Sequence, residues 1–299
     1  MVILSYIAIY LIWGSTFFFI ASAVETIPPA WILAIRWSMG GLFFLILSLI
    51  KSRGKLIASG KNILSSVLIG ILLLIGGNGL ITIAEKTIDS YVTALMISMV
   101  PLVVSLFNFL LFKIRITALQ LTGVITGFLG VSLLLYNGEV SSFEFNLPIL
   151  LIIMGTISWA LGTSLGAKLK VSDNVFLNSS LQMLTAGFFS LLSALYTTED
   201  IRATFRTFSD ESVFALFYLI IFGSLAIGAF NNLIRKEPSI RLTSYTLVNP
   251  VIATLLGIFF GGEAVRSLLF WGLPLILMGL GILLYGERLK TLYFKRNTQ

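Results

Sequence analysis

The chain consists of long apolar stretches separated by short polar connections. A helix that crosses a lipid bilayer needs roughly 20 mostly apolar residues, and ten stretches are about this long. The pattern therefore predicts an all-α polytopic membrane protein with ten transmembrane helices. Their expected bounds are 3–24, 29–50, 63–84, 90–112, 117–136, 147–168, 175–197, 212–234, 241–261 and 267–286.

Charged residues are too few for a water-soluble domain. They make up 11% of the chain, against 57% hydrophobic residues, whereas an ordinary soluble domain carries about 25% charged residues. The chain contains no Cys and no His, which excludes disulfides, zinc sites built on these residues and His-dependent nucleophilic catalysis. We therefore expect no enzyme activity, no cofactor and no metal.

The positions of the charges predict the topology. Lys and Arg gather in the cytoplasmic loops of membrane proteins. If the N-terminus is cytoplasmic and the spans alternate, most of the 20 Lys and Arg lie on the cytoplasmic side, and most of the 13 acidic residues lie on the other. The net charge of +7 is then a topology signal that places both termini in the cytoplasm, and we expect no nucleic-acid partner.

The sequence also repeats weakly, with an offset of 149 residues that aligns Pro101 with Pro250. The same offset aligns Gly123 with Gly272, Gly130 with Gly279 and Tyr136 with Tyr285. The repeat predicts two five-helix halves, at 1–138 and 147–290, and a cytoplasmic tail at 291–299. Because five is odd, the halves are inverted, which is an architecture of secondary transporters with the substrate site near the midplane.

Short motifs in the predicted spans resemble a known family. The first span contains the run Trp13–Phe17, and the second contains Pro29 and Arg36. Together with the run at 250–263, they resemble the EamA family of the drug/metabolite transporter superfamily, as two units over nearly the whole chain. The resemblance implies a 5 + 5 helical transporter of small metabolites, often an exporter of amino acids or related compounds, in the inner membrane of a prokaryote. Ile114 departs from the pattern, since the second unit carries an acidic residue there.

Arg36 is the charged residue that the pattern places well inside a span. Charged side chains within a membrane are costly and tend to face the bundle interior or a cavity. Arg36 could contact a substrate carboxylate or couple the two states of a transporter. It could also snorkel outward or bind free backbone carbonyls. We favour this structural role, because the resemblance implies an Arg here in transporters of very different substrates.

Two pairs of residues lie at matching central positions of the halves. Trp13 and Trp159 are at mid-depth, away from the interfacial belt where Trp is usual, which indicates either cavity lining or packing. Pro101 and Pro250 are near the middle of predicted helices, where Pro removes a backbone hydrogen bond and kinks the helix. These prolines are candidate hinges or simple packing kinks.

Polar residues near the midplane complete the candidate site. Asn78 lies among three glycines, and Tyr245 and Asn249 share one helix face. For each amide within a span, including Asn178 and Gln182, we favour interhelical hydrogen bonding over a ligand contact. The candidate substrate-binding residues are Trp13, Ser15, Arg36, Asn78, Ser98, Trp159, Tyr245 and Asn249, with Pro101 and Pro250 as candidate hinges.

The charges that are missing narrow the expected substrate. No Asp or Glu is placed at mid-membrane, which disfavours antiport of organic cations, and one Arg is too few for a phosphate-bearing substrate. We expect a monomeric secondary transporter or facilitator that exports neutral or zwitterionic amphipathic metabolites, such as aromatic or aliphatic amino acids, by alternating access. Alternatives are a proton-coupled drug or metabolite antiporter, a lipid or nucleotide-sugar translocator, and a non-transporting membrane scaffold.

Glu85 and Glu263 are assigned to the ends of spans, on the side opposite the basic loops. Either residue could still be linked to protons, but their positions at span ends do not favour such a role. We therefore expect Gln at either position to leave steady-state transport largely intact.

Overall fold

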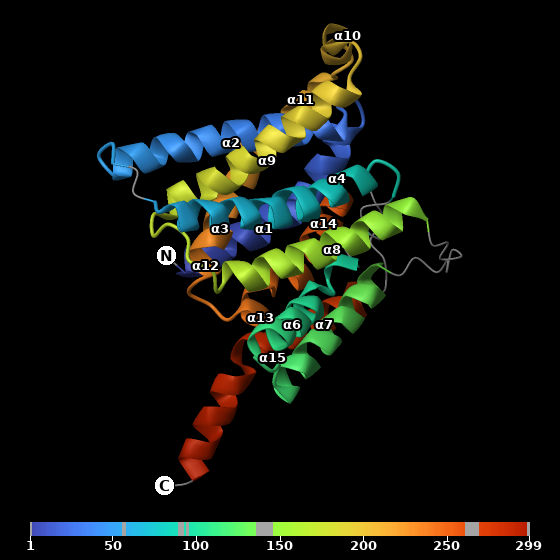
Figure 1. Cartoon of the computed structure of the whole chain (residues 1–299). Helices are drawn as coiled ribbons and strands as arrows, with labels where there is room; N and C mark the ends of the chain where they lie inside the picture. Colours follow the sequence, from blue (N-terminus) through green and yellow to red (C-terminus); the bar gives the residue numbers. More distant parts are fainter. Residues whose placement is uncertain are drawn as a thin grey trace.

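The computed structural model of the protein describes residues 2–55, 58–88, 93, 96–135, 146–260 and 269–297. The described residues form helices joined by turns, without a strand (Figure 1). Six helical segments are long and apolar enough to cross a membrane: Val2–Val24, Pro29–Lys51, Gly60–Ala84, Leu147–Gly166, Val175–Thr197 and Asp210–Leu233. Shorter apolar stretches are Val100–Phe112, Ala118–Leu133 and Phe270–Gly286. An all-helical polytopic chain is therefore confirmed, while the number of ten spans and the cytoplasmic termini stay predictions.

Four of the long spans are unbroken α-helices. They are α1 (Val2–Val24), α2 (Pro29–Lys51), α8 (Leu147–Gly166) and α9 (Val175–Thr197). Pro29 opens α2 in the first turn, where its missing N–H costs no helical hydrogen bond. Asn146 and Asn174 cap α8 and α9, because their side chains accept hydrogen bonds from backbone N–H groups of the first turn.

Two spans contain a π-helical segment, which is wider than an α-helix. The first consists of α3 (Gly60–Gly70), the π-helix η1 (Ile71–Gly79) and α4 (Leu80–Ala84). The second consists of α11 (Asp210–Tyr218), the π-helix η2 (Leu219–Gly223) and α12 (Ser224–Leu233), and follows the short helix α10 (Ile201–Arg206). At the offset of the sequence repeat, η1 and η2 overlap. Such segments are rare and frequently lie at functional sites.

The span predicted at 90–112 is interrupted. Ser98 and Met99 form a turn, after which α6 (Val100–Phe112) begins. The prediction that Pro101 kinks the middle of a helix is therefore wrong. Pro101 lies in the first turn of α6, where no intrahelical hydrogen bond is lost.

The span predicted at 241–261 is interrupted as well. A turn follows α13 (Ser239–Leu242) and precedes α14 (Tyr245–Phe260). Pro250 lies inside α14, as expected. The two repeat-related prolines thus occupy different positions in their helices, and their role as hinges stays a prediction.

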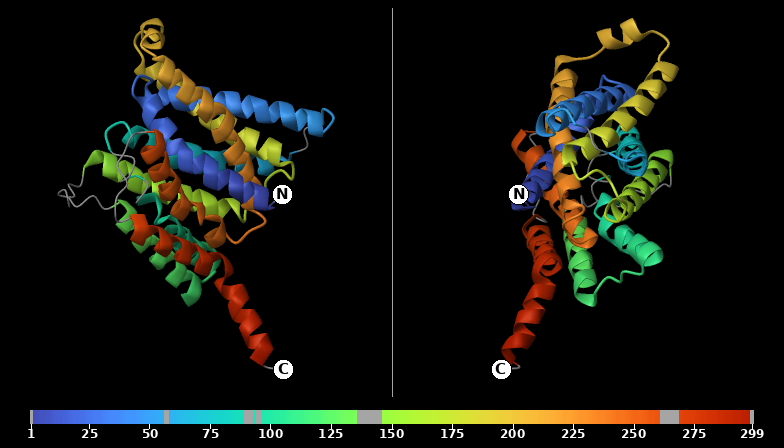
Figure 2. Two further views of the ribbon diagram at one scale, coloured as in Figure 1. Left: turned by 180° about the vertical axis from the view of Figure 1, so that it is seen from behind. Right: turned by 60° about the vertical axis from the view of Figure 1, so that its left-hand side comes forward.

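Helices of the two halves pack against each other in a paired pattern. Helix α7 (Ala118–Leu135) packs against α15 (Leu269–Asn297). In the same way, α2 packs against α9. α1 packs against α14 and against α11–α12, while α8 packs against α6 and against η1–α4. Each contact has a counterpart when the halves are exchanged. Figure 2 shows α15 continuing beyond the bundle to the C-terminus.

Glycines allow two of these helix pairs to approach closely. Between α7 and α15, a Cβ added to Gly123 would lie 2.9 Å from the carbonyl oxygen of Gly279. Between α2 and α9, a Cβ added to Gly187 would lie 2.7 Å from the backbone nitrogen of Ser38. Small residues at helix crossings are typical of membrane proteins. The glycines that the repeat aligned therefore have a packing role.

Candidate functional site

A central cavity of about 60 Å³ lies among helices from both halves of the chain. Its lining is Trp13, Thr16, Phe17, Ile20, Arg36, Trp37, Asn78, Ile81, Ile97, Val100, Thr156, Trp159, Ile227, Tyr245 and Asn249. The lining includes six residues that the sequence predicted: Trp13, Arg36, Asn78, Trp159, Tyr245 and Asn249. The structure thus brings together residues that are more than 200 positions apart in the sequence.

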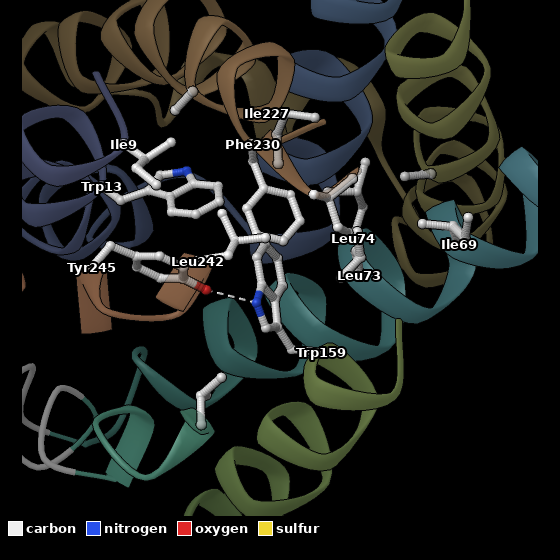
Figure 3. Close-up of a cluster of buried hydrophobic side chains, with 14 of the residues drawn as sticks. Ile9, Trp13, Ile69, Leu73, Leu74, Trp159, Ile227, Phe230, Leu242 and Tyr245 are labelled. Carbon is white, nitrogen blue, oxygen red and sulfur yellow. Dashed lines mark hydrogen bonds between the residues drawn. The ribbon is translucent and has the colours of Figure 1, made fainter. Parts of the chain in front are cut away.

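Three aromatic residues form one part of this lining, which we call the aromatic wall: Trp13, Trp159 and Tyr245 (Figure 3). The ring centroid of Trp13 lies 5.4 Å from that of Trp159 and 4.6 Å from that of Tyr245, both edge-on. The indole Nε1 of Trp159 donates a hydrogen bond of 2.7 Å to the Tyr245 hydroxyl. The two matched tryptophans therefore line the cavity and pack against each other at once.

Arg36 forms a second part of the lining and is 1% exposed. Its Nη1 lies 3.4 Å from Oδ1 of Asn78 in η1, a long hydrogen bond. Its guanidinium carbon lies 4.1 Å from the centre of the Trp37 ring. A Cβ added to Gly223, at the end of η2, would come within 2.9 Å of Nη2. Both π-helical segments therefore contact the same guanidinium group.

Glu85 is buried next to this region, at the end of a span as expected. It follows α4 directly and is 6% exposed. Burial raises the pKa of Glu85 to about 8, and the positive charge of Arg36 acts against this rise. The chain turns immediately after Ala84, because the N–H groups of Thr87 and Ile88 bond back to its carbonyl. Hydropathy marks the end of a span but does not show which neighbours cover that end.

We call Arg36, Trp37, Asn78 and Glu85 the charged end. Several of its polar atoms have no hydrogen-bond partner among the described residues: Nε of Arg36, Nε1 of Trp37 and both carboxylate oxygens of Glu85. Elsewhere in the lining, Oγ1 of Thr156 and Oδ1 of Asn249 are also without a partner there. A buried unpaired polar group costs about 1–3 kcal/mol. These atoms are therefore the ones that water or a ligand is expected to satisfy.

The remaining predicted residues lie outside the lining. Ser15 bridges helices instead, since its hydroxyl donates to the Ile12 carbonyl at 2.7 Å and lies 2.6 Å from the Tyr218 hydroxyl. Ser98 is buried in the turn before α6. Pro101 and Pro250 do not line the cavity either. Glu263 lies outside the described residues.

Buried amides away from the cavity bond between helices, as the sequence suggested. Nδ2 of Asn231 donates to Oε1 of Gln182 at 2.9 Å, and Nε2 of Gln182 lies 3.2 Å from Oδ1 of Asn231. Asn178 accepts a 2.8 Å hydrogen bond from the Ser66 hydroxyl. These bonds join α9 to α12 and to α3. They leave Asn78 and Asn249 as the amides that line the cavity.

Sequence reasoning missed two residues of this lining. Trp37 and Thr156 line the cavity, but neither was among the candidate substrate-binding residues. Trp37 directly follows Arg36 and is 1% exposed. The signal that was available for Thr156 is its position one helical turn before Trp159 on the same face.

Apolar spans around a cavity that both halves line define a polytopic membrane transporter. The EamA-like transporter family model matches residues 1–136 and 146–285, and the chain belongs to this family. YedA of Escherichia coli strain K12, an uncharacterized inner membrane transporter, is 33% identical over 284 residues, which cover 94% of this chain and 90% of YedA. The uncharacterized transporter YvbV of Bacillus subtilis strain 168 is 26% identical over 272 residues, which cover 89% of this chain and 86% of YvbV. One crystal structure has the same fold, with a TM-score of 0.75 and 19% identity over 94% of this chain and 96% of the solved chain.

Proposed function

We propose that the protein is a secondary transporter of small zwitterionic amphipathic metabolites, such as aromatic or aliphatic amino acids. The observation that carries the proposal is the composition of one cavity: a buried arginine with an unpaired donor and an aromatic wall line the same space. A guanidinium group favours a carboxylate ligand. Aromatic rings offer apolar surface and a favourable electrostatic surface for an ammonium group.

The unpaired atoms of the lining suggest how such a ligand would bind. Nε of Arg36 and Nε1 of Trp37 are free donors for a carboxylate. Oδ1 of Asn249 and Oγ1 of Thr156 are free acceptors for an ammonium group. The apolar side chain of the ligand would lie against the aromatic wall. A ligand that carries all three groups would satisfy the cavity better than a cation or a phosphate ester.

Alternating access is the proposed mode of transport. The cavity of about 60 Å³ is small, with room for a few water molecules by the usual volume per water, so a metabolite requires the surrounding helices to move apart. The paired packing of the two halves supports an inverted repeat, in which either face can open in turn. We further propose export from a monomeric protein in an inner membrane, by analogy with the location printed for YedA.

Flux of labelled solutes into proteoliposomes tests the proposal. The panel contains phenylalanine, leucine, lysine, a quaternary amine and a nucleotide sugar, together with phenethylamine, which lacks only the carboxylate of phenylalanine. We expect saturable flux of phenylalanine and leucine, and little flux of phenethylamine. Flux confined to the quaternary amine or the nucleotide sugar would overturn the proposed substrate class. Absence of any flux in folded protein would favour the scaffold alternative.

A further inference from the structure

The buried carboxylate of Glu85 is a titratable group that substrate recognition alone does not use. Its residue is 6% exposed, and neither oxygen has a hydrogen-bond partner in the described part of the chain. An ionised carboxylate without partners is among the most costly groups to bury. Glu85 therefore depends on a nearby positive charge or on a proton for its stability in this position.

The nearby positive charge is Arg36. In the described part of the chain, its positive charge is the one that favours the ionised form of Glu85. Lys86 is exposed. No ion-pair contact among the described residues joins Arg36 directly to Glu85. Asp89 lies outside the described residues. Arg36 therefore compensates the charge of Glu85 through space, without holding its oxygens by hydrogen bonds. A carboxylate stabilised in this way can bind a proton in place of its interaction with the positive charge.

A substrate carboxylate would compete for the same guanidinium group. Once it binds Arg36, two carboxylates share one positive charge inside the bundle. Two negative charges near one cation disfavour the ionised form of one of them. The unsolvated member of the pair is Glu85, because the ligand carboxylate gains the hydrogen bonds of the free donors. Substrate binding should therefore favour the protonated form of Glu85.

We infer that Glu85 is a proton-binding site whose occupancy is linked to the substrate carboxylate on Arg36, which makes the protein a proton–substrate cotransporter. This inference rests on the proposed function. The proton comes from water on the side to which the cavity is open, binds a carboxylate oxygen of Glu85, and returns to water on the other side when the substrate leaves. Transport of a zwitterion then moves one net positive charge.

Coupled flux is the decisive measurement. Proteoliposomes hold labelled phenylalanine and a pH-sensitive dye, with the membrane potential clamped by a potassium ionophore. We expect phenylalanine efflux to make the lumen more alkaline, one proton for each phenylalanine. For Glu85→Gln we expect phenylalanine efflux without this pH change. Efflux from wild type without a pH change, or an unchanged proton ratio in Glu85→Gln, would overturn the inference.

The pH dependence of binding gives a second readout. With a pKa of about 8 for Glu85, the protonated form that binds substrate prevails at pH 7 and falls to about one tenth at pH 9. Phenylalanine should therefore bind wild type about tenfold more weakly at pH 9 than at pH 7. Glu85→Gln, which resembles the protonated residue, should show only the small loss of affinity that deprotonation of the phenylalanine ammonium causes at pH 9. The exposed Glu25 provides the matched control, since Glu25→Gln should keep the tenfold change.

A measurement without substrate separates this inference from the proposed function. If no solute on the panel is transported, the infrared carbonyl band of a protonated carboxylic acid is compared between wild type and Glu85→Gln. A band that is specific to wild type and disappears between pH 7 and pH 9 would retain Glu85 as a proton site, although the substrate class would be wrong. Absence of that band at pH 7 would overturn the proton site itself.

Discussion

The aromatic wall and the charged end line or adjoin the same cavity, but only one of them is complete in itself. In the aromatic wall, the indole of Trp159 bonds to Tyr245, and the rings of Trp13 pack on both. In the charged end, Arg36 and Glu85 keep unpaired polar atoms although both are buried. Among the described residues, no polar side-chain atom of the aromatic wall is buried without a hydrogen-bond partner. The charged end lacks partners that a ligand, water or a proton can supply.

This difference indicates where specificity and energy coupling reside. Apolar surface discriminates weakly between similar ligands, whereas unpaired buried polar groups discriminate strongly against a ligand that leaves them unpaired. The charged end should therefore decide whether a solute is accepted, and the aromatic wall should tune how tightly it binds.

Arg36→Gln should have the largest effect. It removes the charge that receives the carboxylate, and hydrogen bonds to charged groups contribute about 1.5–3 kcal/mol each, so we expect kcat/KM for phenylalanine to fall roughly 10- to 100-fold. Arg36→Lys should recover only part of the loss, because an ammonium group lacks the planar fork. Arg235→Gln is the control, since Arg235 is an exposed residue that pairs with Asp173 at 3.3 Å. Equal losses in both variants would remove Arg36 from the site.

Trp13→Ala should have the next largest effect. It deletes the ring that contacts both other members of the aromatic wall, and an aromatic pair contributes about 0.5–1.5 kcal/mol beyond its buried area. We expect KM for phenylalanine to rise about tenfold, with a smaller change for leucine, while membrane expression is largely retained. Loss of folded protein without a change in KM would show that Trp13 serves packing alone.

Tyr245→Phe should have the smallest effect. It keeps the ring but removes the hydroxyl that accepts from Trp159, leaving one buried indole N–H unpaired at a cost of about 1–3 kcal/mol. Because this cost applies with and without substrate, we expect a lower melting temperature and a change in KM of less than about threefold. A large selective loss for carboxylate-bearing substrates would contradict the division between the two regions.

The aromatic wall was largely predictable from the sequence, and the charged end was not. Trp13 and Trp159 were found because central tryptophans are unusual and lie at matching depths. Arg36 was found as a charge inside a span, but its structural role was favoured, because its free donor depends on neighbours from other helices. Glu85 was correctly placed at a span end, but hydropathy gave no sign that its side chain is buried there.

The spans themselves show the same limit. Apolar length predicted the regions of α1, α2, α8 and α9 within a few residues. It did not predict the turn at Ser98 and Met99, since both residues are compatible with an apolar helix by composition. It also did not predict the π-helices, because hydropathy is insensitive to how many residues complete a turn. Backbone geometry of this kind is decided by packing between helices.

The two π-helices have a consequence for how the protein can change over time. A π-helical turn accommodates one more residue than an α-helical turn, so η1 and η2 are each equivalent to a single-residue insertion in a regular helix. Deleting one residue from either segment would let the span become a regular α-helix. The apolar residues on either side of the deletion would stay in register. The ancestral addition or loss of a single residue could thus detach Asn78 or Gly223 from the guanidinium of Arg36. Among relatives, one-residue gaps at these two places should mark lineages that recognise a different chemical group.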